Sequence, residues 1–325
     1  MEELKVKKSP IQRAKMTLSV LVLILVAACS KVDGEAGRHM KRAQDGGKIQ
    51  VVSTIGMITD VVQEVGGDEV EVTGLMGPGV DPHLYKASQG DIQKLADAEV
   101  IFYGGLHLEG KMTEIFEKLE RRKPTVAVSS KIDPSVLRSG ADAGGSQYDP
   151  HVWFNVKHWV SATESIRDTL SEYDPSNAKK YEDNAAKYIT QLNELDEEIK
   201  SRISEIPEEG RVLVTAHDAF GYFGDAYGVK VMGLQGISTA AEYGSKDVSK
   251  LRDYLVANKI KAVFVESSIP TKSMEAVIAG AKKMGHEIKI GGELYSDSMG
   301  EPGSDADTYI TMVRHNVNTI VEALK

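Results

Sequence analysis

The sequence predicts an α/β protein of two lobes, each with a mainly parallel sheet flanked by helices, joined by one long rigid helix. Three observations lead to this fold class. Short apolar runs alternate with helical patterns through residues 48–173, and the same alternation returns in residues 207–325. Such alternation favours right-handed βαβ units and therefore parallel sheets. Between these stretches, residues 174–206 carry one unbroken helical pattern.

The elements of the first lobe follow from short apolar runs separated by longer amphipathic stretches. The first helical stretch stops at Gly66-Gly67, a common signal for the end of a helix. We expect strands at 49–52, 70–72, 100–103 and 125–128, and helices at 57–65, 88–97 and 111–120.

The second lobe repeats this order. We expect strands at 211–214, 230–232, 262–265 and 287–290, and helices at 219–227, 246–258, 273–284 and 307–324. The segments Val72-Thr73-Gly74-Leu75 and Val231-Met232-Gly233-Leu234 occupy corresponding places in the two halves. This correspondence suggests two lobes of related build, although any two α/β lobes resemble each other at this level of detail.

The connecting helix is expected to begin near Asp174, which can cap it, with Pro175 at its first position. Neither Gly nor Pro interrupts the pattern that follows until Pro207. Apolar residues at steps of three and four form one stripe along it: Tyr181, Ala185, Tyr188, Leu192, Leu195, Ile199 and Ile203. A coiled-coil stripe is the alternative, but a place between two lobes favours a helix that packs along both. A stiff connector of this kind predicts small hinge motion.

The N-terminus predicts export and a lipid anchor. Basic residues precede an apolar run at 17–28 that is shorter than the roughly 20 residues of a membrane span, so residues 1–28 are typical of a signal peptide. The run ends in Val26-Ala27-Ala28-Cys29, which resembles the bacterial lipobox, in which the cysteine carries the lipid. The alternative is an ordinary signal peptide followed by an incidental cysteine. Residues 29–47 are mostly polar and Gly-rich, as expected of a flexible tether.

Composition narrows the classes of function. The formal net charge of -9 argues against nucleic acid as a partner, because phosphate binding requires clustered Lys and Arg. The single cysteine excludes a disulfide framework and a Cys-rich zinc site. No phosphate-binding Gly-rich loop and no Gly-x-Ser-x-Gly elbow occurs in the sequence. The eight histidines therefore become the main candidates for chemistry.

One tripeptide occurs twice, as Asp81-Pro82-His83 and Asp149-Pro150-His151. Each copy predicts a rigid loop that follows a strand end and presents an imidazole. His217 and Asp297 each follow a predicted strand of the second lobe, where ligand sites of α/β sheets lie. Taken singly, His217 fits a hydrogen-bonded strand-end histidine and Asp297 fits a helix cap or turn. Together, three imidazoles and one carboxylate can complete a four-coordinate site for Zn²⁺ or Mn²⁺, with two ligands from each lobe.

The other histidines give weaker signals. His107 precedes an expected helix and suits packing or capping, and His39 lies in the expected tether. His158, His286 and His315 fit surface or core positions.

Four motifs together resemble the metal-binding receptors of ABC transporters, the substrate-binding lipoproteins of cluster A-I and TroA type. They are GLMGPGVDPHLY at 74–85, DPHVWF at 149–154, VTAHDAFGYF at 214–223 and GELYSD at 292–297, in the order of that family. The likeness runs from about Lys48 to the C-terminus. It implies two α/β lobes on a rigid helix, a metal held between them, and delivery of that metal to a membrane permease driven by an ATPase. Position by position, it gives as ligands His83, His151, His217 and Asp297.

The resemblance leaves the ion open between zinc, manganese and iron. Manganese-preferring relatives often have Glu at the position of His217, whereas zinc-dedicated relatives often carry a long His- and acid-rich loop in the first lobe. The stretch 138–148 contains no histidine, so the chain matches neither pattern. We expect carboxylates to fix the imidazole tautomers, with Asp218 and Glu266 as candidates. Asp297, on a loop near the C-terminus, is the ligand expected to move on release.

The function expected from these observations is capture of a divalent metal outside the cytoplasm by a lipid-anchored monomer. Two other functions compete with it. A surface adhesin of the same fold could also be tethered by a lipid. A zinc-dependent hydrolase is less favoured, because catalytic zinc usually keeps one position open for water.

Overall fold

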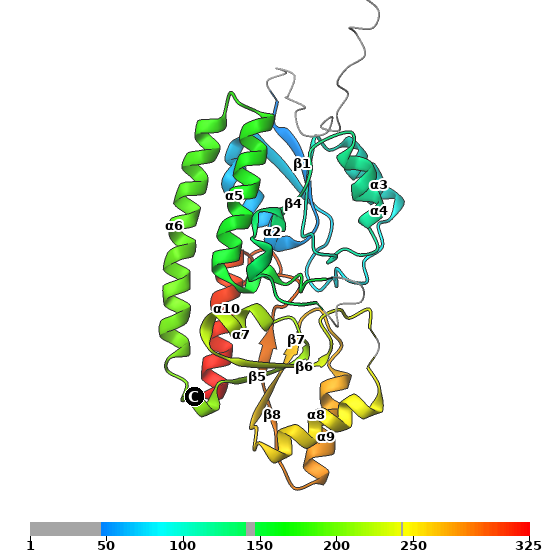
Figure 1. Cartoon of the computed structure of the whole chain (residues 1–325), viewed down its shortest axis with the longest axis vertical. Coiled ribbons are helices and arrows are strands. Elements are labelled where there is room, and N and C mark those ends of the chain that lie inside the picture. The colour runs from blue at the N-terminus through cyan, green and yellow to red at the C-terminus, as the bar shows by residue number, and fades with distance from the viewer. Residues whose placement is uncertain (1–46, 141–146, 242) are drawn as a thin grey trace, which may run out of the picture.

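Two α/β lobes lie beside one long helix in the computed structural model, which describes residues 47–140, 147–241 and 243–325 (Figure 1). The expected signal peptide, Cys29 and all but the last residue of the expected tether lie outside the described residues. Among the helices of those described ranges, none combines the length and the apolar character needed to span a membrane.

The first lobe contains a four-stranded parallel sheet of order β2-β1-β3-β4. Its strands are β1 (Ile49–Ser53), β2 (Val70–Gly74), β3 (Val100–Tyr103) and β4 (Thr125–Ala127). Val51 of β1 is aligned with Val72 on one side and with Val100 on the other. Ile49, Val51 and Val52 are all buried, because a parallel sheet is covered on both faces and its strands are apolar throughout.

Four helices flank this sheet: α2 (Gly56–Gly66), α3 (Gln89–Asp97), α4 (Thr113–Glu120) and α5 (Val156–Tyr173). In Figure 1, α2 and α5 lie toward the long helix, and α3 and α4 lie on the opposite side. Ser88 and Asp91 cap α3 reciprocally, each side chain bonding the other's backbone N–H.

Helix α5 is an element that the sequence-based expectations lacked. Its signals are nevertheless present, because the Asn155 side chain accepts a hydrogen bond from the Lys157 N–H at the start of the helix. A buried stripe at helical spacing follows: Trp159, Ala162, Ile166 and Leu170. This helix carries the chain from the first sheet to the long helix.

The second lobe has the same strand order in space. β5 (Val212–His217) pairs in parallel with β6 (Lys230–Gln235), and β7 (Ala262–Glu266) pairs in parallel with β8 (Lys289–Leu294). These pairs form two separate two-stranded sheets. Strands β5 and β7 lie next to each other, so the four strands follow the spatial order β6-β5-β7-β8 and are treated together as the second sheet. The remaining helices are α7 (Gly221–Tyr227), α8 (Ser245–Ala257), α9 (Lys272–Lys283) and α10 (Tyr309–Leu324). This order matches that of the first lobe strand for strand.

Strand β8 begins later and ends later than the expected strand at 287–290. The expectation stopped at the glycines, but Gly291 and Gly292 continue the strand, and its register shifts opposite Val263 and Phe264. Gly292 has φ 150°, and a Cβ there would lie 2.4 Å from Thr319 of α10. Glycine is therefore required here, because the strand passes too close to the helix for a side chain.

The long helix α6 (Ala178–Ile203) has 26 residues, about 39 Å at 1.5 Å per residue, and runs along both lobes (Figure 1). All seven residues of the expected apolar stripe are buried, and the helix packs against α2, α5 and α10. Its start is later than expected. Asp174 ends α5 instead, and its carboxylate accepts hydrogen bonds from Asn177 Nδ2 at 2.8 Å and Tyr181 Oη at 3.0 Å. Pro175 consequently lies in the turn between the two helices.

The apolar core does not follow the boundary between the lobes. One continuous cluster runs from the first sheet through α5 and α6 to α7 and α10, with members such as Ile58, Leu192, Phe223 and Val313. A second, smaller cluster lies between the second sheet and helices α8 and α9, with members such as Leu251, Leu255, Met274 and Val277. The larger cluster also includes Leu213, Phe264 and Leu294 of the second lobe's strands, so α7 and α10 pack between these strands and the helices of the first lobe.

Candidate metal centre

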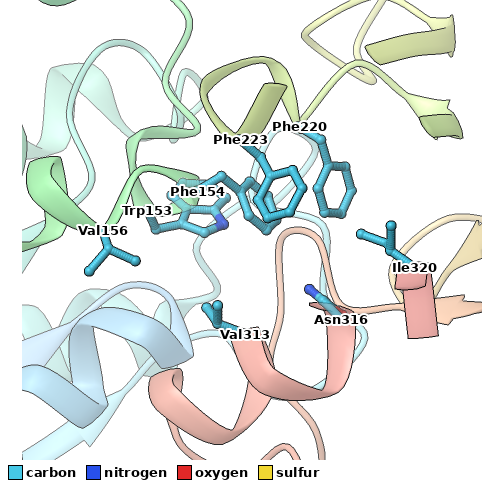
Figure 2. Close-up of a pocket in the computed structure, with 8 residues that line it drawn as sticks. All are labelled: Trp153, Phe154, Val156, Phe220, Phe223, Val313, Asn316 and Ile320. Atoms are coloured by element: carbon cyan, nitrogen blue, oxygen red, sulfur yellow. The ribbon is translucent and has the colours of Figure 1, made fainter. Parts of the chain in front are cut away.

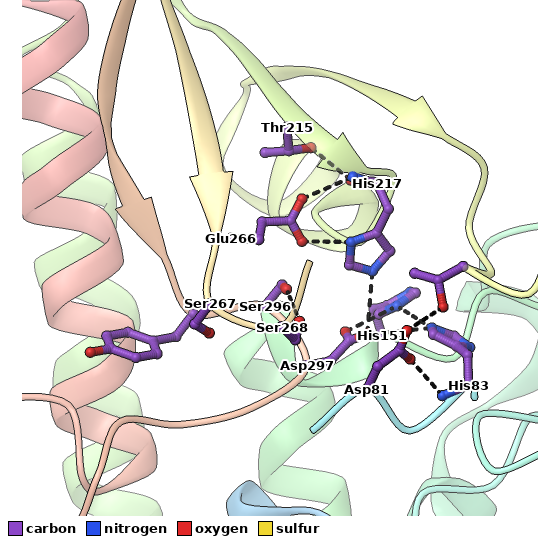
Figure 3. A network of polar contacts seen from close by, with 12 residues as sticks. Asp81, His83, His151, Thr215, His217, Glu266, Ser267, Ser268, Ser296 and Asp297 are labelled. Atoms are coloured by element: carbon purple, nitrogen blue, oxygen red, sulfur yellow. Dashed lines mark hydrogen bonds and ion pairs between the residues drawn. The ribbon is translucent and has the colours of Figure 1, made fainter. Parts of the chain in front are cut away.

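The four residues expected as ligands lie together where the lobes meet: His83, His151, His217 and Asp297 (Figure 3). One potential ligand atom of each lies within 4.8 Å of every other. His83 is 4 % exposed and the other three at most 1 %. Among the described residues, no other group of three or more His, Cys, Asp or Glu side chains has this arrangement.

Different loops and strands bring these side chains together. His217 is the last residue of β5, and Asp297 lies in the loop after β8, so both sit at the carboxyl edge of the second sheet. His83 lies in the long loop after β2. His151 differs from the expectation, because it lies far beyond β4 and directly before a single helical turn, Val152–Phe154, that leads into α5. Only the first of the two tripeptides therefore follows a strand.

Four distances between the potential donor atoms are close to the edge length of a tetrahedral metal site. The Nε2 atoms of His83 and His151 are 3.2 Å apart. Asp297 Oδ2 lies 3.5 Å from His83 Nε2 and 3.4 Å from His217 Nε2, and Oδ1 lies 3.4 Å from His151 Nε2. A tetrahedral ion with ligands at 2.0–2.1 Å separates neighbouring donor atoms by about 3.3 Å. The cluster thus has the dimensions of a four-coordinate site.

Hydrogen bonding within the cluster is incomplete. His217 Nε2 and both carboxylate oxygens of Asp297 are buried and have no hydrogen-bond partner within the part of the chain that the structure describes. Buried polar atoms without partners are rare and costly. A cation held among these atoms would satisfy all three, so the donor set fits a bound metal.

Carboxylates behind two of the imidazoles fix their tautomers. Glu266 Oε2 is 2.5 Å from His217 Nδ1, and Oε1 accepts the His217 backbone N–H at 2.8 Å. Asp149 Oδ1 lies 2.7 Å from His151 Nδ1 and accepts that residue's backbone N–H at 3.0 Å. With Nδ1 engaged as the donor, each ring directs Nε2 toward the cluster.

Of the two carboxylates expected in this role, Glu266 is confirmed and Asp218 is wrong. Within the described ranges, no hydrogen bond joins Asp218 to an imidazole; its backbone N–H donates to Gly236. Asp149 takes the place expected of Asp218. The sequence contained its signal, since Asp149 lies two residues before His151 in the repeated tripeptide.

The charges of the cluster follow from burial and from these partners. Burial lowers the pKa of His83 to about 3, which keeps this ring neutral. Burial opposes charge on His151 as well, but Asp149 and then Asp297 raise its pKa to about 9. Burial likewise opposes a charge on His217, but Glu266 and Asp297 outweigh this effect, so the pKa of His217 lies well above its ordinary value. Burial would raise the pKa of Asp297, yet His217 and His151 hold it well below the ordinary value. Such a site can exchange protons for a divalent cation.

The other described histidines lie outside the cluster. His158 is buried in α5 and its ring contacts Tyr222, with centroids 5.1 Å apart. His286 Nε2 lies 2.7 Å from the Ile260 carbonyl, and His315 lies beside Asp305 on the surface. His107 is exposed, with a positive φ of 67°.

Comparisons with known proteins identify the family of this chain. A protein-family profile described as "Zinc-uptake complex component A periplasmic" (ZnuA) matches residues 51–323. The manganese-binding lipoprotein MntA of Bacillus subtilis is 50 % identical over 278 residues, which cover 86 % of this chain and 90 % of the relative. The zinc-binding protein TroA of Treponema pallidum is 46 % identical over 284 residues, covering 87 % of this chain and 91 % of the relative.

The fold agrees as well. The solved structure of the periplasmic zinc-binding protein TroA from Treponema pallidum superposes with a TM-score of 0.83 at 46 % identity, over 86 % of this chain and 99 % of that one. The family profile, the relatives and this structural neighbour all cover the two lobes and the long helix. The chain therefore belongs to the ZnuA family, the metal-binding receptors of ABC transporters whose motifs its sequence resembles.

Proposed function

We propose that this protein is an extracytoplasmic receptor that captures a divalent transition metal between its lobes and delivers it to an ABC permease driven by an ATPase. The ligands are Nε2 of His83, His151 and His217 and the carboxylate of Asp297. The relatives named above are a manganese-binding and a zinc-binding protein, so the proposal concerns these two ions first, ahead of iron.

The observation that carries the proposal is the spacing of four buried side chains. Four distances between their potential donor atoms are 3.2–3.5 Å, and three of these atoms have no hydrogen bond among the described residues. Protein interiors do not leave an ionised carboxylate and an imidazole nitrogen unsatisfied at such distances without cause. A tetrahedral cation supplies that cause, because it meets every donor at once.

Binding is expected to release protons. His83 is already neutral, whereas His151 and His217 have raised pKa values and must give up protons before their rings can bind a cation. The apparent affinity should therefore fall as the pH is lowered, because protons then compete more strongly for the two rings.

The proposal is capture without catalysis. Catalytic zinc has three protein ligands and an open position for water or substrate. Here four side chains surround the ion, and all four are buried. A hydrolase would need a vacant position next to a general base, and Glu266, the acid nearest to that role, is already bonded to His217.

Anchoring to the membrane completes the proposal. Residues 1–28 would be removed as a signal peptide, Cys29 would carry the lipid, and residues 29–47 would tether a monomeric receptor to the membrane. Support comes from the single cysteine at the end of the apolar run and from the MntA relative, which is named a lipoprotein.

Metal titration of variants tests the proposal. His83→Ala and Asp297→Asn should each lower Zn²⁺ and Mn²⁺ affinity by more than the roughly 10–100-fold that loss of an outer partner costs. His286→Ala, a histidine outside the cluster whose Nε2 lies beside the Ile260 carbonyl, is the matched control and should bind as the wild type does. Unchanged affinity in both ligand variants, measured by calorimetry or chelator competition, would refute the site. Metal uptake that is normal in cells lacking the protein, with adhesion lost, would favour the adhesin instead.

A further inference from the structure

Asp297 differs from the other ligands in how its side chain is held. His151 and His217 are oriented by carboxylates, but neither oxygen of Asp297 has a hydrogen-bond partner within the described residues. Apart from its contacts at 3.4–3.5 Å with the three imidazoles, this carboxylate is therefore oriented only by the backbone of the loop on which it stands. The contacts that fix this loop decide where the fourth ligand lies.

One side chain, Asn316, clamps that loop two residues before the ligand. Its Oδ1 accepts the backbone N–H of Tyr295 at 2.9 Å, and its Nδ2 donates to the Tyr295 carbonyl at 2.7 Å. Both ends of one amide thus bond both backbone groups of one residue, as a neighbouring strand would. This pair of bonds fixes the orientation of the peptide groups just upstream of Asp297.

Asn316 has an unusual setting for an amide. It lies on α10, is 3 % exposed, and faces a small pocket walled by apolar side chains (Figure 2). It is the only amide among the eight lining residues, which also include Trp153, Phe223, Val313 and Ile320. A polar group in such a wall is costly unless it is hydrogen-bonded. The two bonds to Tyr295 are what offsets that cost.

A second contact holds the next residue of the loop from the other lobe. Trp153 Nε1 donates to the Ser296 carbonyl at 3.0 Å, and the Trp153 ring packs against His151 with centroids 5.2 Å apart. The loop is thus fixed at two successive residues before Asp297, once from α10 and once from the segment that carries His151.

We propose that Asn316 is a positioning residue for the metal site: by clamping Tyr295 it sets the distance of the Asp297 carboxylate from the three imidazoles. This inference rests on the proposed function. Without the clamp, the three imidazoles remain in place and the carboxylate is displaced. The protein then binds a metal more weakly and with altered geometry.

Cobalt provides a readout that a change in stability does not move, because the visible spectrum of bound Co²⁺ depends on its coordination geometry. Asn316→Leu removes both bonds and keeps the number of side-chain heavy atoms. Asn316→Ala, which cannot overpack, carries the same expectation should the leucine variant fail to fold. We expect a roughly 10–100-fold loss of Co²⁺ affinity. The spectrum should shift toward that of Asp297→Ala.

Val317→Ala is the matched control. Val317 is the next residue of α10 and is also 3 % exposed, but it belongs to the apolar core and not to the clamp. It should lower the unfolding temperature while keeping the wild-type Co²⁺ spectrum and affinity. Wild-type spectrum and affinity in the Asn316 variants would overturn this inference alone. Failure of the wild-type protein to bind Co²⁺, Zn²⁺ or Mn²⁺ would overturn the proposed function together with it.

Discussion

Replacing Glu266 by glutamine tests whether the carboxylate behind His217 contributes to metal binding. The carboxylate accepts two hydrogen bonds from one residue, the backbone N–H at 2.8 Å and the ring Nδ1–H at 2.5 Å. A glutamine has one acceptor and one donor at this end. In either orientation, its NH₂ group therefore faces a donor of His217. If it faces Nδ1, the ring must move its proton to Nε2, the atom that would bind the ion.

The expected effect is a loss of about 10–100-fold in affinity, or about 1.4–2.7 kcal/mol. The pH dependence gives a second signature. Burial lowers the pKa of His217, but Glu266 is the largest influence that raises it, so protons compete with the metal more strongly in the wild type. The metal affinity of the wild type should therefore fall more steeply with decreasing pH than that of Glu266→Gln. The difference in affinity between the two proteins should become smaller at low pH.

Chelator competition with Zn²⁺ and Mn²⁺ between pH 6 and 8 measures both effects. Glu109→Gln is the matched control, because Glu109 is also a buried glutamate, 3 % exposed, but bonds Thr54 Oγ1 and the Gly104 N–H. Equal affinity of Glu266→Gln and the wild type would refute the argument. So would an equal loss in Glu109→Gln, since the effect would then reflect a buried charge anywhere in the fold.

Three further predictions concern stability, release and anchoring. Burial raises the pKa of Asp60 from 3.8 to about 6, so between pH 3.8 and 6 the folded protein holds a proton that the unfolded chain has lost. The free energy of unfolding therefore falls as the pH rises through this range. Asp60→Asn can still accept the hydrogen bonds of Tyr188 and Tyr309. It should be more stable than the wild type by up to about 3 kcal/mol at pH 7.5 and about equally stable at pH 4. Urea unfolding that finds the variant less stable at pH 7.5 would contradict this. Thr239 Oγ1 donates a hydrogen bond to Asp81 Oδ2 across the lobes at 2.6 Å. Thr239→Val should speed chelator-driven metal release about fivefold, as expected for the loss of a bond of about 1 kcal/mol. An unchanged release rate in stopped-flow experiments would count against this prediction. Cys29→Ala should abolish palmitate labelling, and labelling that persists would exclude Cys29 as the anchor.

Sequence reasoning succeeded where a periodic pattern was long or a residue type was rare. The stripe of α6 repeats over seven buried positions, so its face was predictable residue by residue. His83, His217 and Asp297 were predictable because they follow strand ends, where parallel sheets place their ligand sites. His151 follows no strand and was predictable only from the repeated tripeptide. Helix α5 was missed although its cap and stripe were present.

Contacts that depend on the folded chain could not be predicted from the sequence. Asp149 was predictable only as part of a tripeptide, and its bond to His151 depends on the loop conformation. Asn316 interrupts the apolar stripe of α10, between Val313 and Ile320, which marks it as unusual. Its partner, Tyr295, lies 21 residues away, and nothing in the local pattern identifies it. The start of α6 was misplaced because Asp174 caps no helix there and serves the end of α5 instead.

The division of the apolar core has a consequence for the order in which an ion would exchange its ligands. Asp297 is tied through Asn316 to α10, which shares the larger core with the segments that carry His83 and His151. His217 ends a strand whose Val214 and Ala216 pack into the smaller core with α8 and α9, whereas its Leu213 packs into the larger core. If α8 and α9 shift and move the end of this strand with them, the ion would keep three ligands and lose the His217 imidazole. His217 would then leave before Asp297, the ligand that the sequence led us to expect to move. A donor from the permease could then occupy the vacated coordination position before the remaining bonds break, so that the cation would pass between the two proteins without ever being fully hydrated.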